Sequence, residues 1–270
     1  SSNNDCIIDF RPGSNGAYGT LYIYNNGTGV YWYANSANRI TGGAISNNTW
    51  THLAVCRSGT STKLFINGVQ SGSTYSDSTN YGTGTPWIGQ FNDGVGSGYF
   101  NGYISNLRVT NACLYSPSPK ADNFVPPTAP LSREVSNGQC VLLTCQSNRF
   151  IDNSGYNLLE YTNGNMKIET ITPTVPSSPY STTTNGGSAV FDGSGDYLSM
   201  TTGTSLGSGD FTISCWVYLT SAPGSETPAV CSSYNYYTTG YNGNFVARIS
   251  TDNLWRSFDG DRKSTRLNSS

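Results

Sequence analysis

The stretch from Trp50 to Gly68 predicts an antiparallel β-hairpin. It reads THLAVCR after Trp50, then a short polar link, then KLFI followed by Asn67 and Gly68. Apolar residues recur at every second position in both runs, which is the period of a half-buried strand. An Asn-Gly pair tolerates the positive φ angles of a tight turn. The segment is therefore expected to form two paired strands that end in a turn.

The same alternation recurs along most of the chain and predicts an all-β fold. The runs are separated by Asn-Gly, Asp-Gly and Ser-Gly turns, and no long segment has the period of a helix. With 31 glycines and only 11% charged residues, the composition is that of a turn-rich globular protein. We expect strands at residues 6–10, 20–24, 29–33, 49–57, 63–66, 85–88, 102–109, 139–145, 189–191, 197–200, 211–219, 244–249 and 253–258.

Charge and hydropathy exclude two classes of partner. The formal net charge is −2, and the 14 Lys and Arg residues are scattered rather than gathered into a basic stripe. Without such a stripe, binding to nucleic acid is not expected. No apolar run approaches the length of about 18 residues that suggests a transmembrane helix, so membrane insertion is not expected either.

The cysteines do not predict a metal site. They lack CxxC pairs and are odd in number, so small buried apolar residues in strands are the simplest interpretation, with a disulfide framework as the alternative. They are Cys6, Cys56, Cys113, Cys140, Cys145, Cys215 and Cys231.

Proline content and charge divide the chain. Residues 116–138 begin with SPSPKADNFVPPT and predict an extended linker. The last ten residues, 261–270, carry a sudden cluster of charges, and we interpret them as a sequencing-adapter scar rather than native protein.

The pattern of strand, polar turn and aromatic strand that begins at Gly19 is repeated from Gly243. This repetition predicts a fragment of a tandem-repeat protein.

Four segments resemble the laminin-G-like, concanavalin A-like lectin/glucanase superfamily. They are the Trp50–Gly68 hairpin, residues 191–198 as an early hairpin, residues 210–217 as the first long core strand, and residues 87–89 with 102–109 as closing strands. The resemblance covers most of residues 1–260. It implies a jelly-roll β-sandwich of two antiparallel sheets. The arrangement most resembles repeats in phage and virion structural proteins.

In this chain the closing elements of that family precede the opening ones. Residues 1–115 then correspond to the later part of one laminin-G-like module, and residues 139–260 to the earlier part of the next. The two parts could close into one circularly permuted sandwich, because the termini of such folds lie close together. The alternative is two half-sandwiches, each with an open sheet face and open edges.

No catalytic residues are expected. A glycosidase needs two carboxylates about 5–10 Å apart, but Glu134, Glu160, Glu169 and Glu226 are isolated and form no paired motif. His52 is the only histidine, and no Gly-x-Ser-x-Gly motif accompanies it. We expect its imidazole to be hydrogen-bonded by neighbours within a strand. A polysaccharide-active enzyme remnant is the least favoured reading.

No cofactor is required, but calcium is one alternative. Relatives in the resembled family often hold Ca²⁺ at the rim of the sandwich through carboxylates and carbonyls, and Asp192 and Asp196 flank Gly193-Ser194-Gly195. Ordinary turn chemistry would place the same residues there.

Aromatic residues are the best candidates for ligand contact. Tyrosine amid Asn, Ser and Gly is typical of recognition surfaces, and sugar rings stack on aromatic planes. Alternation requires either Trp32 or its two tyrosine neighbours to face the core, and we expect Trp50, Trp87 and Trp216 to be core residues. The candidate ligand-binding residues are Tyr31, Tyr33, Tyr234, Tyr236, Tyr237 and Tyr241.

The sequence therefore predicts a recognition or adhesion module of an extracellular or virion-surface protein. Its expected partners are carbohydrate or another cell-surface polymer, together with neighbouring repeats of the same protein. The competing hypothesis is a structural spacer or decoration module with no small ligand.

Overall fold

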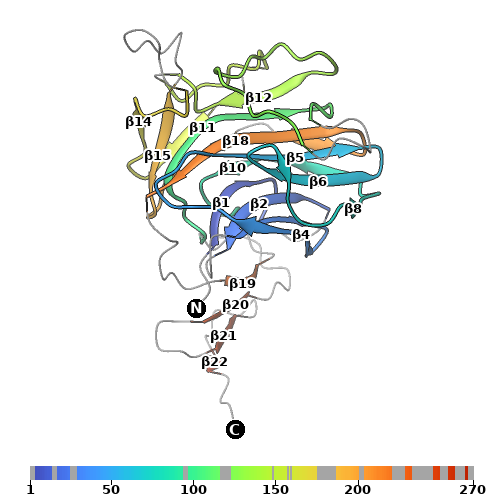
Figure 1. Cartoon of the computed structure of the whole chain (residues 1–270). Helices are drawn as coiled ribbons and strands as arrows, with labels where there is room; N and C mark the ends of the chain where they lie inside the picture. The colour runs from blue at the N-terminus through green and yellow to red at the C-terminus, as the bar shows by residue number, and fades with distance from the viewer. Residues whose placement is uncertain are drawn as a thin grey trace.

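The computed structural model describes residues 4–13, 17–24, 29–93, 97–115, 123–147, 149–156, 158, 160–174, 187–200, 204–220, 229–232, 246–249, 255–258 and 265–266. The regular elements within these ranges are all strands, as the sequence predicts. Two large antiparallel sheets lie face to face and form a β-sandwich (Figure 1).

One layer is a seven-stranded sheet. Its strand order is β13-β16-β10-β1-β2-β3-β4, and each adjacent pair is antiparallel. The strands are β1 (Asn4–Asp9), β2 (Gly19–Tyr24), β3 (Gly29–Ala34), β4 (Ala37–Ala44), β10 (Trp87–Ile88), β13 (Glu160–Asn163) and β16 (Tyr197–Met200).

The other layer is a nine-stranded sheet. Its main path is β14-β15-β11-β18-β5-β6-β7, while β12 pairs with β11 and β8 pairs with β6. The strands are β5 (Thr51–Ser58), β6 (Ser61–Ile66), β7 (Val69–Gln70), β8 (Tyr75–Ser76), β11 (Asn101–Thr110), β12 (Cys140–Thr144), β14 (Lys167–Glu169), β15 (Ser188–Asp192) and β18 (Phe211–Leu219).

Two small sheets complete the described strands. β9 (Tyr81–Gly84) pairs with β17 (Thr204–Gly207). β19 (Ala229–Ser232), β20 (Val246–Ile249), β21 (Trp255–Phe258) and β22 (Thr265–Arg266) form a four-stranded sheet. β22 lies in the stretch 261–270, which the sequence reading left out of the fold.

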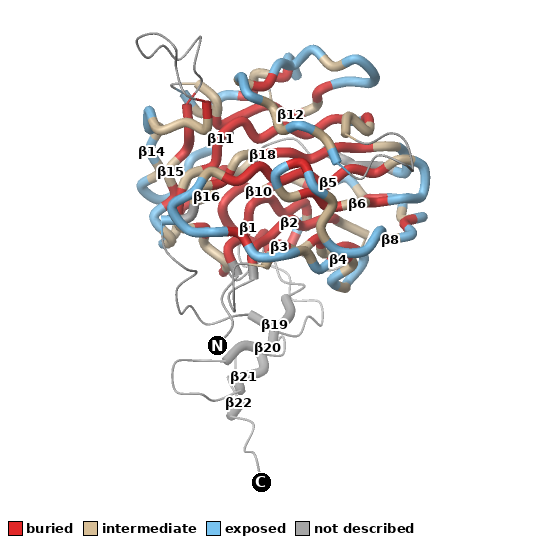
Figure 2. Tube along the Cα trace, viewed as in Figure 1, coloured by how far each residue is buried: buried red, intermediate tan, exposed pale blue. Residues whose placement is uncertain are grey.

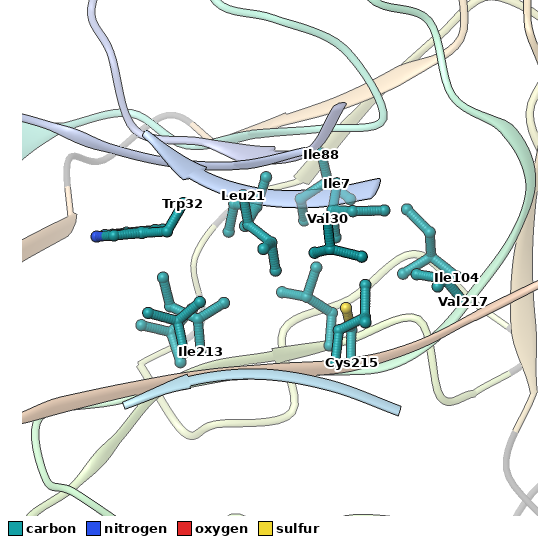
Figure 3. Close-up of a cluster of buried hydrophobic side chains, with 14 of the residues drawn as sticks. Ile7, Leu21, Val30, Trp32, Ile88, Ile104, Ile213, Cys215 and Val217 are labelled. Carbon is teal, nitrogen blue, oxygen red and sulfur yellow. The ribbon is translucent and has the colours of Figure 1, made fainter. Parts of the chain in front are cut away.

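The core lies between the two large sheets, whose central strands are mostly buried (Figure 2). Leu21, Val30 and Trp32 of the seven-stranded sheet face Ile213 and the neighbouring inward residues of β18 (Figure 3). The indole of Trp32 is fully buried and packs directly on Gly19, where an added Cβ would collide with the ring. Trp32 is therefore the core member of the Tyr31–Tyr33 run.

Strands from both sides of the Pro-rich segment close a single sandwich. β18, from the second half of the chain, lies between β5 and β11 of the first half. Its register places Ile213 opposite both Val55 and Val109. Because this pairing fills the centre of the nine-stranded sheet, the two parts of the chain form one sandwich and not two separate half-sandwiches.

The Trp50–Gly68 hairpin is confirmed. β5 and β6 pair in register from Leu53 opposite Ile66 to Ser58 opposite Ser61. Asn67 and Gly68 have φ angles of 50° and 78° and connect β6 to β7 as a tight turn. In contrast, β4 was not predicted from the sequence, because its ANRITGGA segment is polar and rich in glycine and lacks a clear alternation.

The expectation that three further tryptophans belong to the core is wrong. Trp50, Trp87 and Trp216 are only half-buried. Leu53, Ile88 and Val217 point into the core. Each tryptophan lies an odd number of positions from one of them, so its side chain points to the outer face of its sheet.

Candidate ligand-binding surface

A cluster of aromatic side chains covers part of the outer face of the seven-stranded sheet. Leu21, Ile23, Val30 and Trp32 point inward, so the intervening Tyr22, Tyr31 and Tyr33 point outward. Tyr22 lies opposite Tyr31 across β2 and β3, and their rings stack with centroids 5.4 Å apart and planes at 17°. We call Tyr22, Tyr31, Tyr33, Phe91 and Arg11 the tyrosine face.

Phe91 and Arg11 complete this surface from the loops beside the sheet. The Phe91 ring meets Tyr22 edge-on, with centroids 5.6 Å apart. The Arg11 guanidinium lies 5.1 Å from the Phe91 ring centre and 5.7 Å from that of Tyr33, which is within cation–π range. The surface therefore combines flat aromatic rings with a cation.

Asp9 holds Arg11 in place. An oxygen of the buried Asp9 carboxylate lies 2.6 Å from an Arg11 nitrogen. Asp9 also accepts hydrogen bonds from the Thr20 hydroxyl at 2.8 Å and from the Asn92 backbone N–H at 2.9 Å. Burial opposes the charge of Arg11, but the Asp9 charge and its hydrogen bonds outweigh burial and raise the Arg11 pKa. The guanidinium is thus a fixed positive charge.

Hydrogen-bonding side chains lie beside the rings. The Tyr22 hydroxyl donates to Asn38 Oδ1 at 2.8 Å, and Asn38 lies opposite Tyr33 in the β3–β4 pair. The Ser97 hydroxyl donates to Asp93 at 2.7 Å in the same loop region as Phe91. Amide and hydroxyl groups next to aromatic planes are the chemistry that recognises a polar ring with an apolar face.

A second aromatic group lies on the outer face of the nine-stranded sheet. Trp50, Tyr103 and Tyr218 are all half-buried. The Trp50 ring centre is 6.4 Å from that of Tyr103 and 5.5 Å from that of Tyr218. On the seven-stranded sheet, Trp87 and Tyr197 stack at 4.2 Å.

His52 is enclosed by aromatic rings instead of hydrogen-bonding groups. Its side chain is fully buried, with ring centroids 5.2 Å from Trp216, 5.8 Å from Tyr115 and 5.7 Å from Phe124. Within the described part of the chain neither ring nitrogen has a hydrogen-bond partner. The expectation of an imidazole bonded by its neighbours is therefore wrong. Burial, assisted by the positive charge of Arg108, lowers the pKa of His52 from 6.5 to about 3.

Asp192 and Asp196 bind backbone amides. Asp196 accepts hydrogen bonds from the N–H groups of Asn165 at 2.7 Å and Asp192 at 3.0 Å, and Asp192 accepts one from Ser194 at 2.8 Å. Burial raises the pKa of Asp196. These are turn contacts that join the β15–β16 loop to the Asn163-Gly164 turn. No cluster of three or more His, Cys, Asp or Glu side chains suited to a metal occurs among the described residues. Calcium binding at this pair stays a prediction.

The structure brings together two of the six predicted ligand-binding residues, Tyr31 and Tyr33. Tyr234, Tyr236, Tyr237 and Tyr241 lie outside the described residues. The sequence reading missed Tyr22, Phe91 and Arg11. Strand parity could have identified Tyr22, which alternates with the inward residues Leu21 and Ile23, but Phe91 and Arg11 arrive through loops whose course the sequence does not indicate.

The predicted cysteine environment can be compared with the structure at six positions. Cys6, Cys56, Cys140, Cys145 and Cys215 are buried, Cys113 is half-buried, and all six are free thiols. Cys231 lies outside this comparison, since its side chain is not described.

The chain was compared with protein-family models, with curated proteins and with solved structures. Residues 1–117 match the Laminin_G_3 model, described as concanavalin A-like lectin/glucanases superfamily. No curated protein and no solved structure gave a significant match. In the described residues no helix is long and apolar enough to cross a membrane. Together with the two-sheet sandwich, the family match shows that residues 1–117 belong to the concanavalin A-like lectin/glucanase superfamily.

Proposed function

We propose that this chain is a non-catalytic recognition module that binds carbohydrate or another surface polymer through the tyrosine face. The module would act within a tandem-repeat protein outside the cell or on a virion, with neighbouring repeats as further partners. It would require no cofactor. Weak binding at each module would be strengthened by repetition along such a protein.

The tyrosine face is the observation that supports this proposal. Tyr31 and Tyr33 are half-buried and reach the outside of the sandwich, while the buried Tyr22 and Phe91 pack against them and support their rings. Arg11 adds a cation fixed by Asp9. Such a surface suits a polymer whose sugar rings carry carboxylate or sulfate groups, because the rings could stack while the anion pairs with the guanidinium.

A glycan array that includes neutral and acidic polysaccharides tests the proposal on the whole chain. We expect binding to acidic glycans that falls at least tenfold in Tyr31→Ala and in Tyr33→Ala, because each substitution removes a ring from the surface. Arg11→Gln should weaken the binding of acidic glycans more than the binding of neutral glycans.

Tyr156→Ala is the matched control. Tyr156 is 52% exposed and lies outside the tyrosine face, so its removal should leave glycan binding unchanged. Absence of binding to any glycan by the folded chain would instead favour the spacer or decoration module. Hydrolysis of a polysaccharide would favour an enzyme.

A further inference from the structure

Two cysteines from distant parts of the sequence meet on the outer face of the nine-stranded sheet. Cys56 lies on β5, and Cys113 follows the end of β11. Both belong to one apolar cluster in which Cys113, Tyr115 and Phe124 pack over Ala54, Cys56 and Phe65. The two thiols are close enough for each to shift the pKa of the other, and the Cys113 thiol donates a hydrogen bond to the Tyr115 carbonyl at 3.2 Å.

Thr212 of β18 fixes the segment that carries Cys113. Its hydroxyl donates to the Ala112 carbonyl at 2.8 Å and accepts a hydrogen bond from the Leu114 N–H at 3.0 Å. The same hydroxyl is 3.4 Å from Cys56 Sγ, since Thr212 lies directly opposite Cys56 in the β5–β18 pair. Residues on both sides of Cys113 are thus anchored at the position next to Cys56.

The two thiols differ in accessibility and acidity. Cys113 is half-buried, whereas Cys56 is almost fully buried. The neighbouring Cys56 lowers the pKa of Cys113, and this effect prevails over burial and the charge of Asp210, which both raise it. Burial and the neighbouring Cys113 raise the pKa of Cys56. Cys113 is therefore the thiol that reacts first.

We propose that Cys56 and Cys113 are a redox-sensitive pair that closes to a disulfide when the chain meets a low-molecular-weight disulfide such as glutathione disulfide. The bond joins the segment that precedes the Pro-rich residues 116–138 to strand β5. It closes a loop that contains β6 to β11, and this covalent constraint stabilises the sandwich by restricting the unfolded chain.

The reaction proceeds by two thiol–disulfide exchanges. The Cys113 thiolate attacks one sulfur of glutathione disulfide, which breaks its S–S bond, forms a mixed disulfide on Cys113 and releases one glutathione. Cys56 then attacks the Cys113 sulfur and releases the second glutathione, which takes up the Cys56 proton. Two protein thiols are oxidised, and one glutathione disulfide is reduced to two glutathione molecules.

Peptide mass spectrometry of the whole chain tests this pairing. After incubation of the folded protein with glutathione disulfide and alkylation of the remaining thiols, trypsin should release residues 40–57 and 109–120 as separate peptides with one cysteine each. We expect these peptides to be linked, with a mass two hydrogens below their sum. The thermal midpoint of the oxidised protein should rise and return to its starting value with a reductant.

Three variants separate this pair from adventitious oxidation. Cys56→Ser and Cys113→Ser should each abolish the link and the shift of the thermal midpoint. Cys140→Ser should leave both unchanged, since the Cys140 thiol donates to the Leu142 carbonyl elsewhere. A stable mixed disulfide on Cys113 without the link to Cys56 in the wild-type protein would overturn the proposal, as would links that join Cys113 equally to other cysteines.

Discussion

Acidification should destabilise this protein through His52. The pKa of this buried imidazole is about 3 in the folded state and 6.5 when it is free in water. Between these values the unfolded chain binds a proton that the folded chain does not. The free energy of unfolding must therefore fall as the pH drops from 6.5 toward 3.

The size of the effect follows from the two pKa values. Linkage gives about 1.4 kcal/mol for each pH unit inside the window, or about 2.5 kcal/mol between pH 6 and pH 4. The groups around His52 offer no compensation for a charge. Trp216 and Phe124 are apolar rings, Arg108 is already positive, and the Tyr115 hydroxyl accepts a hydrogen bond from Arg108 at 3.1 Å.

Asp5 has the opposite effect on stability as the pH falls, so its contribution must be separated from that of His52. Burial raises the pKa of Asp5 to about 7 against a hydrogen bond from the Asn101 N–H. The folded chain thus keeps a proton on Asp5 that the unfolded chain has lost, so this group favours folding as the pH falls from 7 toward 4. Both the wild-type protein and His52→Phe retain Asp5. Subtracting their free energies of unfolding therefore cancels the Asp5 contribution and leaves that of His52.

Urea denaturation of both proteins at pH 6 and pH 4 measures this difference in the free energy of unfolding. NMR follows the protonation of the imidazole directly. Since His52 is the only histidine, its ring carbons and protons give one set of resonances. We expect no titration of these resonances between pH 8 and pH 5 in the folded protein, and a midpoint near 6.5 in urea. A midpoint near 6.5 in the folded protein, or equal pH dependence in His52→Phe, would refute the reasoning.

Two further substitutions test the packing and the buried polar network. Trp32→Ala should lower the free energy of unfolding by about 4 kcal/mol, because it leaves a cavity between the sheets; urea denaturation that finds a loss below about 1 kcal/mol would contradict this role. Asp77→Ala should cost about 3 kcal/mol, since the buried carboxylate accepts hydrogen bonds of 2.8 Å from both Thr62 and Tyr81. Glu134→Ala, at an exposed position, is the control and should stay within about 0.5 kcal/mol of the wild type.

The sequence was sufficient for the strands whose apolar residues alternate. β5 and β18 show this clearly, since the strands predicted at 49–57 and 211–219 are found at Thr51–Ser58 and Phe211–Leu219. β4 was missed because β-propensity depends on neighbours, and its glycine-rich segment pairs with β3 to form the edge of the sheet. The position of β18 between β5 and β11 also depends on long-range pairing, which alternation does not specify.

The site was predictable only in part. The parity of Tyr31 and Tyr33 was open until the structure placed Trp32 in the core. Trp50 and Trp216 were assigned to the core by residue type, although their own strands alternate in the opposite sense. For these two tryptophans, the alternation of the neighbouring apolar residues was a better guide to burial than residue type.

A nuclear Overhauser experiment between His52 and Trp216 tests most directly whether the two halves of the chain close one sandwich. The two residues lie opposite each other on β5 and β18, with ring centroids 5.2 Å apart. The structure predicts cross-peaks between the single imidazole and the Trp216 indole in the folded, full-length protein. Imidazole cross-peaks to Tyr115 and Phe124 without any to Trp216 would contradict the placement of β18 beside β5.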